Sequence, residues 1–138
     1  MKRTTKIIVT LLLALVMTIP TTIGVFAATP EQQVQPRWTS IFSIELDMTF
    51  VGTEGNALGA ARKQSTATNI EGTLTVYKQV GNDWEFVADG YAQKSFGTLA
   101  VSVDFYAEEG ATYKAVFDVT AYTGSAAETE TVDYTETY

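Results

Sequence analysis

Apolar and polar residues alternate with a period of two over most of the chain from Trp38 onward. Between Phe42 and Phe50 every even position is apolar and every odd position is polar or acidic. Such alternation is typical of a strand with one buried and one solvated face. Similar patterns recur over 68–80, 99–106 and 113–122. The residues expected to point inward are Ile44, Leu46, Met48, Phe50, Leu74, Val76, Val101, Val103, Phe105, Tyr113, Ala115, Phe117 and Val119.

Turn-forming residues separate these segments. We predict turns at 52–56, 81–83, 108–110 and 123–125, each of which contains glycine. The small residues of 57–66 favour a short strand that allows close packing of sheets, whereas 89–97 is compatible with a loop or a ragged edge strand. Threonine and acidic residues mostly alternate over 128–138, as expected of a protected edge strand.

Seven short strands in one small domain favour an all-β fold, an antiparallel two-sheet sandwich. No part of the chain after the N-terminal segment has a helical period over three turns. A small closed β-barrel is the alternative. The predicted organisation is a signal peptide at 1–27, a flexible leader at 28–36 and a β-sandwich domain at 37–138.

The N-terminal segment has the order of a secretory signal peptide. Three basic residues among the first six precede an apolar run over 7–19, and small residues follow. This run is too short for a comfortable transmembrane helix. We therefore predict a signal-peptide helix cleaved between Ala27 and Ala28, a secreted, extracellular protein, and no membrane association after cleavage. An uncleaved N-terminal anchor is the alternative.

The excess of acidic over basic residues makes anionic partners unfavourable. The whole chain has 9 Lys+Arg and 16 Asp+Glu, and three of the basic residues leave with the signal peptide, so the mature net charge is 6 − 16 = −10. A domain this acidic should repel nucleic acid and anionic membrane surfaces. We expect no nucleic-acid partner.

Two missing residue types limit the catalytic and metal-binding chemistry that the chain can perform. The chain contains no cysteine and no histidine. These absences exclude disulfides, thiolate nucleophiles, the Ser-His-Asp arrangement and the commonest zinc ligand. We therefore predict a protein that is not an enzyme and has no cofactor or metal. A carboxylate pair could support glycoside hydrolysis, and an enzyme working through carboxylates alone is the minor alternative.

Three tyrosines fall on otherwise polar strand faces, namely Tyr77, Tyr106 and Tyr122. If their strands are neighbours in one sheet, the rings form a platform on which a glycan stacks. The alternative is that each ring packs singly against its cross-strand neighbours. We thus predict an extracellular binding or interaction module whose partner is a glycan or a protein at the cell surface. A second route to a partner chain is pairing along an edge strand, either 89–97 or the C-terminal segment.

The stretch from Glu109 to Val119 resembles the penultimate strand of fibronectin type III and other immunoglobulin-like domains. A Gly-x-x-Tyr entry, Gly110 to Tyr113, precedes alternating apolar residues. The resemblance implies an immunoglobulin-like sandwich with a tyrosine corner, in which the Tyr113 hydroxyl bonds to nearby backbone. Trp84 follows a hairpin turn, so we expect it to cover a sheet face or edge rather than fill the core.

Over nearly the whole mature chain, the order of features is similar to a family of small secreted proteins of Gram-positive bacteria, a domain of unknown function. The shared features include the opening Val34-Gln35-Pro36-Arg37-Trp38 and a hairpin of the form T-x-x-V-x-K-x-x-G-x-x-W. The Gly-x-x-Tyr strand and a Glu/Thr-rich end closing with Tyr138 complete them. This resemblance implies export and a β fold, and it brings no activity with it.

Overall fold

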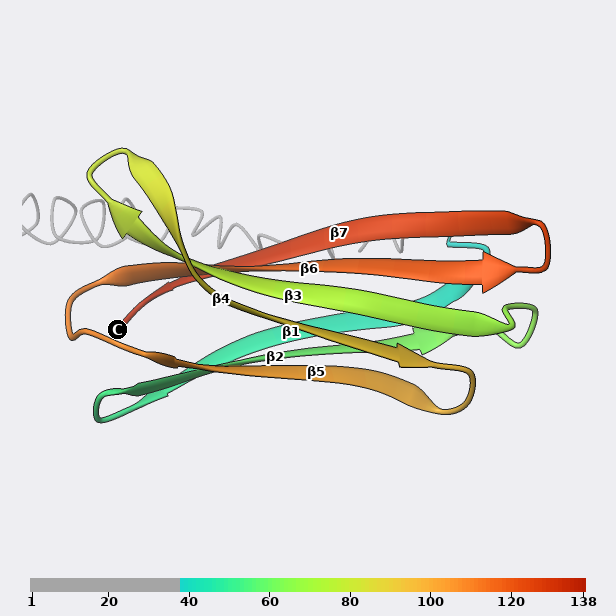
Figure 1. Cartoon of the computed structure of the whole chain (residues 1–138), viewed down its shortest axis with the longest axis horizontal. Helices are drawn as coiled ribbons and strands as arrows, with labels where there is room; N and C mark the ends of the chain where they lie inside the picture. Colours follow the sequence, from blue (N-terminus) through green and yellow to red (C-terminus); the bar gives the residue numbers. More distant parts are fainter. Residues whose placement is uncertain (1–37) are drawn as a thin grey trace, which may run out of the picture. The chain divides into compact units, whose positions relative to one another are not determined.

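The computed structural model of the protein describes residues 38–138, which form two antiparallel sheets (Figure 1). One sheet has the strand order β1-β2-β5 and the other β4-β3-β6-β7. The strands are β1 Ile41–Val51, β2 Glu54–Lys63, β3 Asn69–Val80, β4 Asp83–Lys94, β5 Thr98–Tyr106, β6 Thr112–Thr123 and β7 Ala126–Thr137.

The predicted two-sheet sandwich is therefore confirmed. The strands of residues 38–138 stay in two separate sheets, so they close no barrel. No helix in this part of the chain is long and apolar enough to span a membrane. The predicted signal peptide, its cleavage site at Ala27 and Ala28, and the leader at 28–36 lie outside the described residues.

Alternation along each strand builds the core between the sheets. In β5, the four residues from Leu99 to Phe105 at odd positions are buried, and the residues between them are exposed. This is the arrangement expected when one face of each sheet is removed from water. All thirteen residues predicted to point inward are buried or pack against the buried cluster, which confirms the predicted parity of the strands.

In the core, the ring of Phe117 lies between glycines of both sheets. Phe117 is fully buried on β6. A Cβ atom at Gly59 of β2 would lie 2.8 Å from this ring, and one at Gly72 of β3 would lie 2.7 Å from it. Both distances are shorter than carbon–carbon van der Waals contact. The small residues of the predicted 57–66 strand thus allow close packing of the sheets, as expected.

Two turns differ from the sequence-based expectation at their boundaries. The turn predicted at 52–56 is confined to Gly52 and Thr53, because Gly55 already pairs with Phe50 across the β1–β2 hairpin. The ambiguous segment 89–97 is a strand as far as Lys94, since β4 stays paired with β3 along this length.

The start of β1 also departs from simple alternation. Phe42 has 60 % of its surface exposed, although it begins the alternating run, whereas Ile41 is buried. The register of the β1–β2 pair shifts between Ile41 and Ser43. A bulge of this kind reverses which side chain faces the core, so Ile41 takes the inward position.

Glu128 joins the beginning of β7 to the chain that enters β1. Its carboxylate accepts hydrogen bonds from the backbone N–H groups of Thr39 at 3.0 Å, Ser40 at 2.5 Å and Ile41 at 3.1 Å. These bonds, chiefly that from Thr39, hold the pKa of Glu128 below its usual value. Glu128 therefore connects the two sheets where β1 and β7 meet, because β1 and β7 belong to different sheets.

Replacing Glu128 with alanine is expected to lower the free energy of unfolding by about 1–3 kcal/mol, because up to three N–H groups lose a charged acceptor. Since the folded-state pKa is depressed, this contribution is present above the unfolded-state pKa and is lost as the pH falls through the folded-state pKa. Urea denaturation at pH 7 and at about pH 3 measures both effects. The deficit of the variant should shrink at the acidic pH; a deficit that stays constant would contradict the assignment. Glu130→Ala on the same strand is the control.

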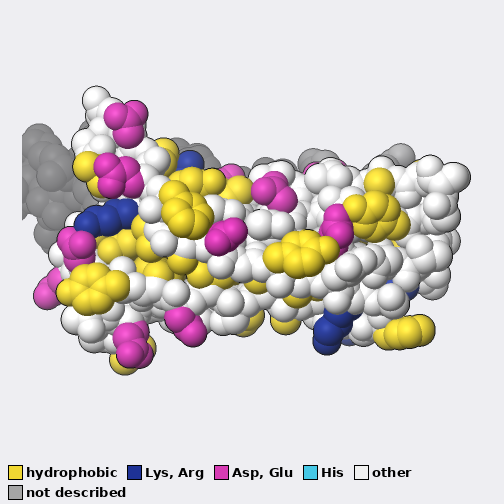
Figure 2. All heavy atoms as spheres, viewed as in Figure 1, with side chains coloured by type: hydrophobic (Ala, Val, Ile, Leu, Met, Phe, Trp, Pro, Cys, Tyr) yellow, Lys and Arg dark blue, Asp and Glu magenta, His cyan; other side chains and the backbone are white. Residues whose placement is uncertain are grey.

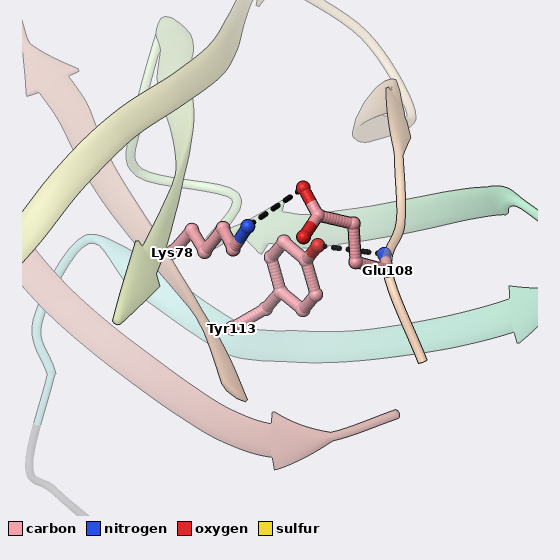
Figure 3. A network of polar contacts seen from close by, with 3 residues as sticks. All are labelled: Lys78, Glu108 and Tyr113. Atoms are coloured by element: carbon pink, nitrogen blue, oxygen red, sulfur yellow. Dashed lines mark hydrogen bonds and ion pairs between the residues drawn. The ribbon is translucent and has the colours of Figure 1, made fainter. Parts of the chain in front are cut away.

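The Tyr113 hydroxyl forms the predicted corner. Its ring is buried, and its oxygen accepts a hydrogen bond of 2.9 Å from the backbone N–H of Glu108 (Figure 3). The carboxylate of Glu108 in turn pairs with the ammonium of Lys78 at 2.7 Å, which raises the pKa of Lys78. The corner thus fixes the loop between β5 and β6, and this loop connects the two sheets.

Tyr113→Phe is expected to cost about 1–3 kcal/mol of unfolding free energy, because the Glu108 N–H loses its acceptor while the ring packing is kept. Denaturant unfolding monitored by circular dichroism measures the loss. Tyr77→Phe is the matched control, since the Tyr77 hydroxyl makes no hydrogen bond within residues 38–138. Equal midpoints for the two variants would show that the Tyr113 hydroxyl contributes nothing.

Candidate functional site

The structure does not bring the three predicted tyrosines onto one surface. Tyr77 and Tyr122 lie on the outer face of the four-stranded sheet, at opposite ends of it, because Tyr77 pairs with Lys114 and Tyr122 with Asn69. Eight residues of β3 separate these positions, which corresponds to roughly 27 Å. Tyr106 ends β5 in the other sheet. The prediction of a shared three-tyrosine platform is therefore wrong.

Tyr122 belongs to a polar cluster on β3, β4 and β6. Its hydroxyl donates to one oxygen of Glu71 at 2.5 Å, and Tyr91 donates to the other at 2.8 Å. These two bonds, first that from Tyr122, lower the pKa of Glu71, and the same contacts raise the pKa of both phenols. Both phenol hydrogens are used within the cluster, which links three strands through side-chain hydrogen bonds.

Tyr77 lies beside a cation and a second aromatic ring. The ammonium of Lys114 is 4.5 Å from the centroid of the Trp84 ring and 5.7 Å from that of Tyr77. At these distances the cation is attracted to the ring faces, so it occupies surface that a ligand would need for stacking. Trp84 itself lies on β4, an edge strand of its sheet, as the sequence predicts.

Several large hydrophobic side chains elsewhere on the surface stand apart from one another. Figure 2 shows such side chains with acidic and other polar ones between them, and a band of adjoining apolar atoms left of the centre of the view. Phe86 and Phe96 are examples of large apolar side chains that are well exposed. Single exposed apolar residues are normal on soluble domains, so they do not mark a site by themselves.

Tyr106 lines a hollow on the outer face of the three-stranded sheet. The hollow has a volume of about 630 Å³. Two adjacent cross-strand rows form its floor, the first made of Val51, Glu54 and Tyr106 and the second of Thr49, Asn56 and Asp104. Tyr106 is 67 % exposed. The hollow therefore combines one accessible aromatic face with amide, hydroxyl and carboxylate groups. Thr53, Gly55 and Phe105 complete its lining.

Some polar side chains of the hollow are hydrogen-bonded to their neighbours. The side-chain amide of Asn56 donates to the hydroxyl of Ser102 at 2.8 Å and to Asp104 at 2.6 Å. The backbone N–H of Ala107 donates to the carbonyl of Thr53 at 2.9 Å, which joins the β1–β2 turn to the end of β5. A site whose groups are already ordered loses less entropy when a ligand binds.

The charge of the hollow is negative. Its lining includes the carboxylates of Glu54 and Asp104 and no lysine or arginine. Such a site repels anionic ligands. Among residues 38–138, no group of three or more side chains of the metal-binding types could hold a metal ion. The hollow thus suits a ligand without negative charge that exchanges hydrogen bonds with its polar groups.

A smaller hollow of about 210 Å³ lies on the same face. It includes Ser43 and Glu45 of β1, Ala60 and Arg62 of β2, and Thr98 of β5. The residues of both hollows other than Tyr106 were not anticipated from the sequence. Their meeting depends on the register of β2 with β1 and β5, which periodicity alone does not determine.

Comparisons with known proteins add little to this picture. No protein family matches the chain, and no curated protein does so either. A crystal structure of a protein from Archaeoglobus fulgidus is similar at a TM-score of 0.38 and 11 % sequence identity, over 72 % of this chain and 98 % of that chain. A structural similarity this low gives no information about function.

Proposed function

We propose that the protein is a secreted, non-catalytic module that binds a neutral glycan in the hollow around Tyr106. The observation that carries the proposal is the exposed ring of Tyr106 beside the fixed amide of Asn56 and the carboxylate of Asp104. Sugars present an apolar ring face that packs on an aromatic side chain, and hydroxyls that exchange hydrogen bonds with amides and carboxylates.

The composition supports binding rather than catalysis. The chain has neither histidine nor cysteine, so its general bases and nucleophiles are restricted to the remaining residue types. The order of basic, apolar and small residues before position 28 supports export. A surface in contact with the medium or the cell wall meets abundant glycans, which agrees with a binding role there.

We further infer that the sandwich belongs to the immunoglobulin-like class. Two features support this assignment. One is the tyrosine corner formed by Tyr113. The other is the strand order, in which β3, β6 and β7 share a sheet, as do β1, β2 and β5. The remaining strand, β4, lies beside β3. Variable-type immunoglobulin domains likewise carry extra strands in the sheet that contains their third strand.

Pairing through an edge strand is the weaker alternative. The C-terminal segment forms edge strand β7, whose inward positions include Glu128, Glu130 and Glu136. Inward-pointing charges protect an edge from pairing with another chain. The other candidate edge, β4, has a shift of register between Val76 and Tyr77 of its partner strand, and such a bulge also interrupts pairing.

Tyr106→Ala is expected to weaken glycan binding by at least about tenfold, because the stacking surface is lost. The measurement is a glycan-array screen followed by calorimetric titration with cellohexaose, chitohexaose and maltohexaose. Tyr91→Ala, which removes an exposed tyrosine from the other sheet, is the control and should leave binding unchanged. Hexagalacturonate, an anionic chain, should not bind. The proposal fails if no neutral glycan binds, or if binding survives Tyr106→Ala.

A further inference from the structure

The two hollows are neighbours on one sheet face. The larger hollow reaches the cross-strand row centred on Asn56, and the smaller begins at the row centred on Ala60. Only one row, made of Asp47, Leu58 and Ser102, lies between them. Six residues of β2 separate Asn56 from Arg62, a length of roughly 20 Å. The two hollows together are therefore long enough to contact several linked sugar residues.

The surface between the hollows is partly apolar. At the first row of the smaller hollow, Ala60 pairs directly with Ala100, so neither β2 nor β5 raises a bulky side chain there. Leu58 is 45 % exposed and offers an apolar surface in the middle of the face. The flanking side chains are short or polar and supply hydrogen-bonding groups; they are Ser43, Glu45, Asp47, Thr98 and Ser102.

The geometry points to one continuous track along β2 for a linear, neutral oligosaccharide, with the larger hollow and the smaller hollow as successive subsites. This inference rests on the proposed function. A sheet face favours such a ligand over an extended peptide. Peptides that add to a sheet gain affinity from free main-chain groups at an edge, whereas β2 is paired on both sides. The track offers only side chains, namely a ring, hydroxyls, amide, carboxylates and one guanidinium.

The chain-length dependence of binding tests this inference. For whichever of cellohexaose, chitohexaose or maltohexaose binds, the hexasaccharide should bind at least about tenfold more tightly than its own disaccharide, because the longer chain fills both subsites. Ala60→Gln places extra atoms in the smaller hollow. It should remove this advantage and leave the affinity for the disaccharide unchanged.

Arg62→Ala is a second variant, which shortens a side chain of the smaller hollow and avoids any crowding. It should also reduce the affinity for the hexasaccharide alone. Thr135→Gln on the outer face of the other sheet is the matched control and should change neither affinity. Thermal unfolding of each variant verifies that the fold is retained.

Failure of the track and failure of the proposed function would give different experimental results. Equal affinities for hexasaccharide and disaccharide, both sensitive to Tyr106→Ala, would overturn the track and keep the glycan site. An equal loss for both ligands in Ala60→Gln and Arg62→Ala would also overturn it. Competition by an extended uncharged peptide such as a threonine–serine octapeptide would overturn it in favour of a peptide site. Absence of all glycan binding would remove the proposed function and the track together.

Discussion

Phe117→Ala is expected to lower the free energy of unfolding by about 3–5 kcal/mol. The ring is fully buried and fills the space next to two glycines, Gly59 and Gly72. Neither glycine has a side chain that could move into the cavity, and both strands are held by their sheet pairing. The cost should therefore fall toward the upper end of this range. Small domains have total stabilities of about 5–15 kcal/mol, so the loss removes a large share.

Urea denaturation measures this loss. Phe86→Ala is the matched control, because Phe86 is mostly exposed on β4 and its removal should change stability by no more than about 0.5 kcal/mol. Gly59→Ala should destabilise the wild-type protein through contact with the ring, but should be tolerated better in the Phe117→Ala background. Additive effects of the two changes would show that Gly59 and Phe117 are not coupled.

Leu74→Asp is expected to prevent folding at ordinary temperatures. Leu74 is fully buried on β3, between Gly90 of β4 and Phe117 of β6. A carboxylate there loses its hydration, and it would have to ionise without a partner or take up a proton, at a cost of several kcal/mol or more. The far-ultraviolet circular dichroism spectrum should lose its β signal.

Gln79→Asp is the control for this change, because it introduces the same carboxylate on the same strand. Gln79 is exposed near the end of β3 and lies opposite Trp84. The stability of this variant should stay within about 0.5 kcal/mol of the wild type. A folded Leu74→Asp protein, or two variants of equal stability, would show that the core is assigned to the wrong face of β3.

Periodicity in the sequence was sufficient for the fold because most of the strands have one buried face. The alternation in 99–106 matches the alternating burial of β5 residue by residue. The pattern was insufficient where pairing shifts, as at Ile41 and Phe42, because a bulge depends on the partner strand. The pairing of 89–94 was also hidden, since Ala88, Gly90 and Ala92 face the core with side chains too small to produce a clear apolar signal.

The site was harder to anticipate than the fold. Tyr77, Tyr106 and Tyr122 were correctly placed on outer faces. The alternation of side chains along a strand, however, says nothing about which sheet that strand joins. Sheet membership is decided by pairings between strands distant in the sequence, such as β2 with β5 and β3 with β6. The meeting of Asn56 with Asp104 is a consequence of the first of these pairings, so local sequence patterns could not reveal it.

The same strand order sets the time the chain needs to fold. The hairpins β1–β2, β3–β4 and β6–β7 join neighbours in sequence, and hairpins of this kind form in roughly microseconds. Each sheet is complete only after β2 meets β5 or β3 meets β6, and these encounters close long loops. Domains dominated by such distant contacts fold in roughly milliseconds to seconds. During that interval the hairpins expose unpaired edges, so refolding at high protein concentration should favour association between chains over the native sandwich.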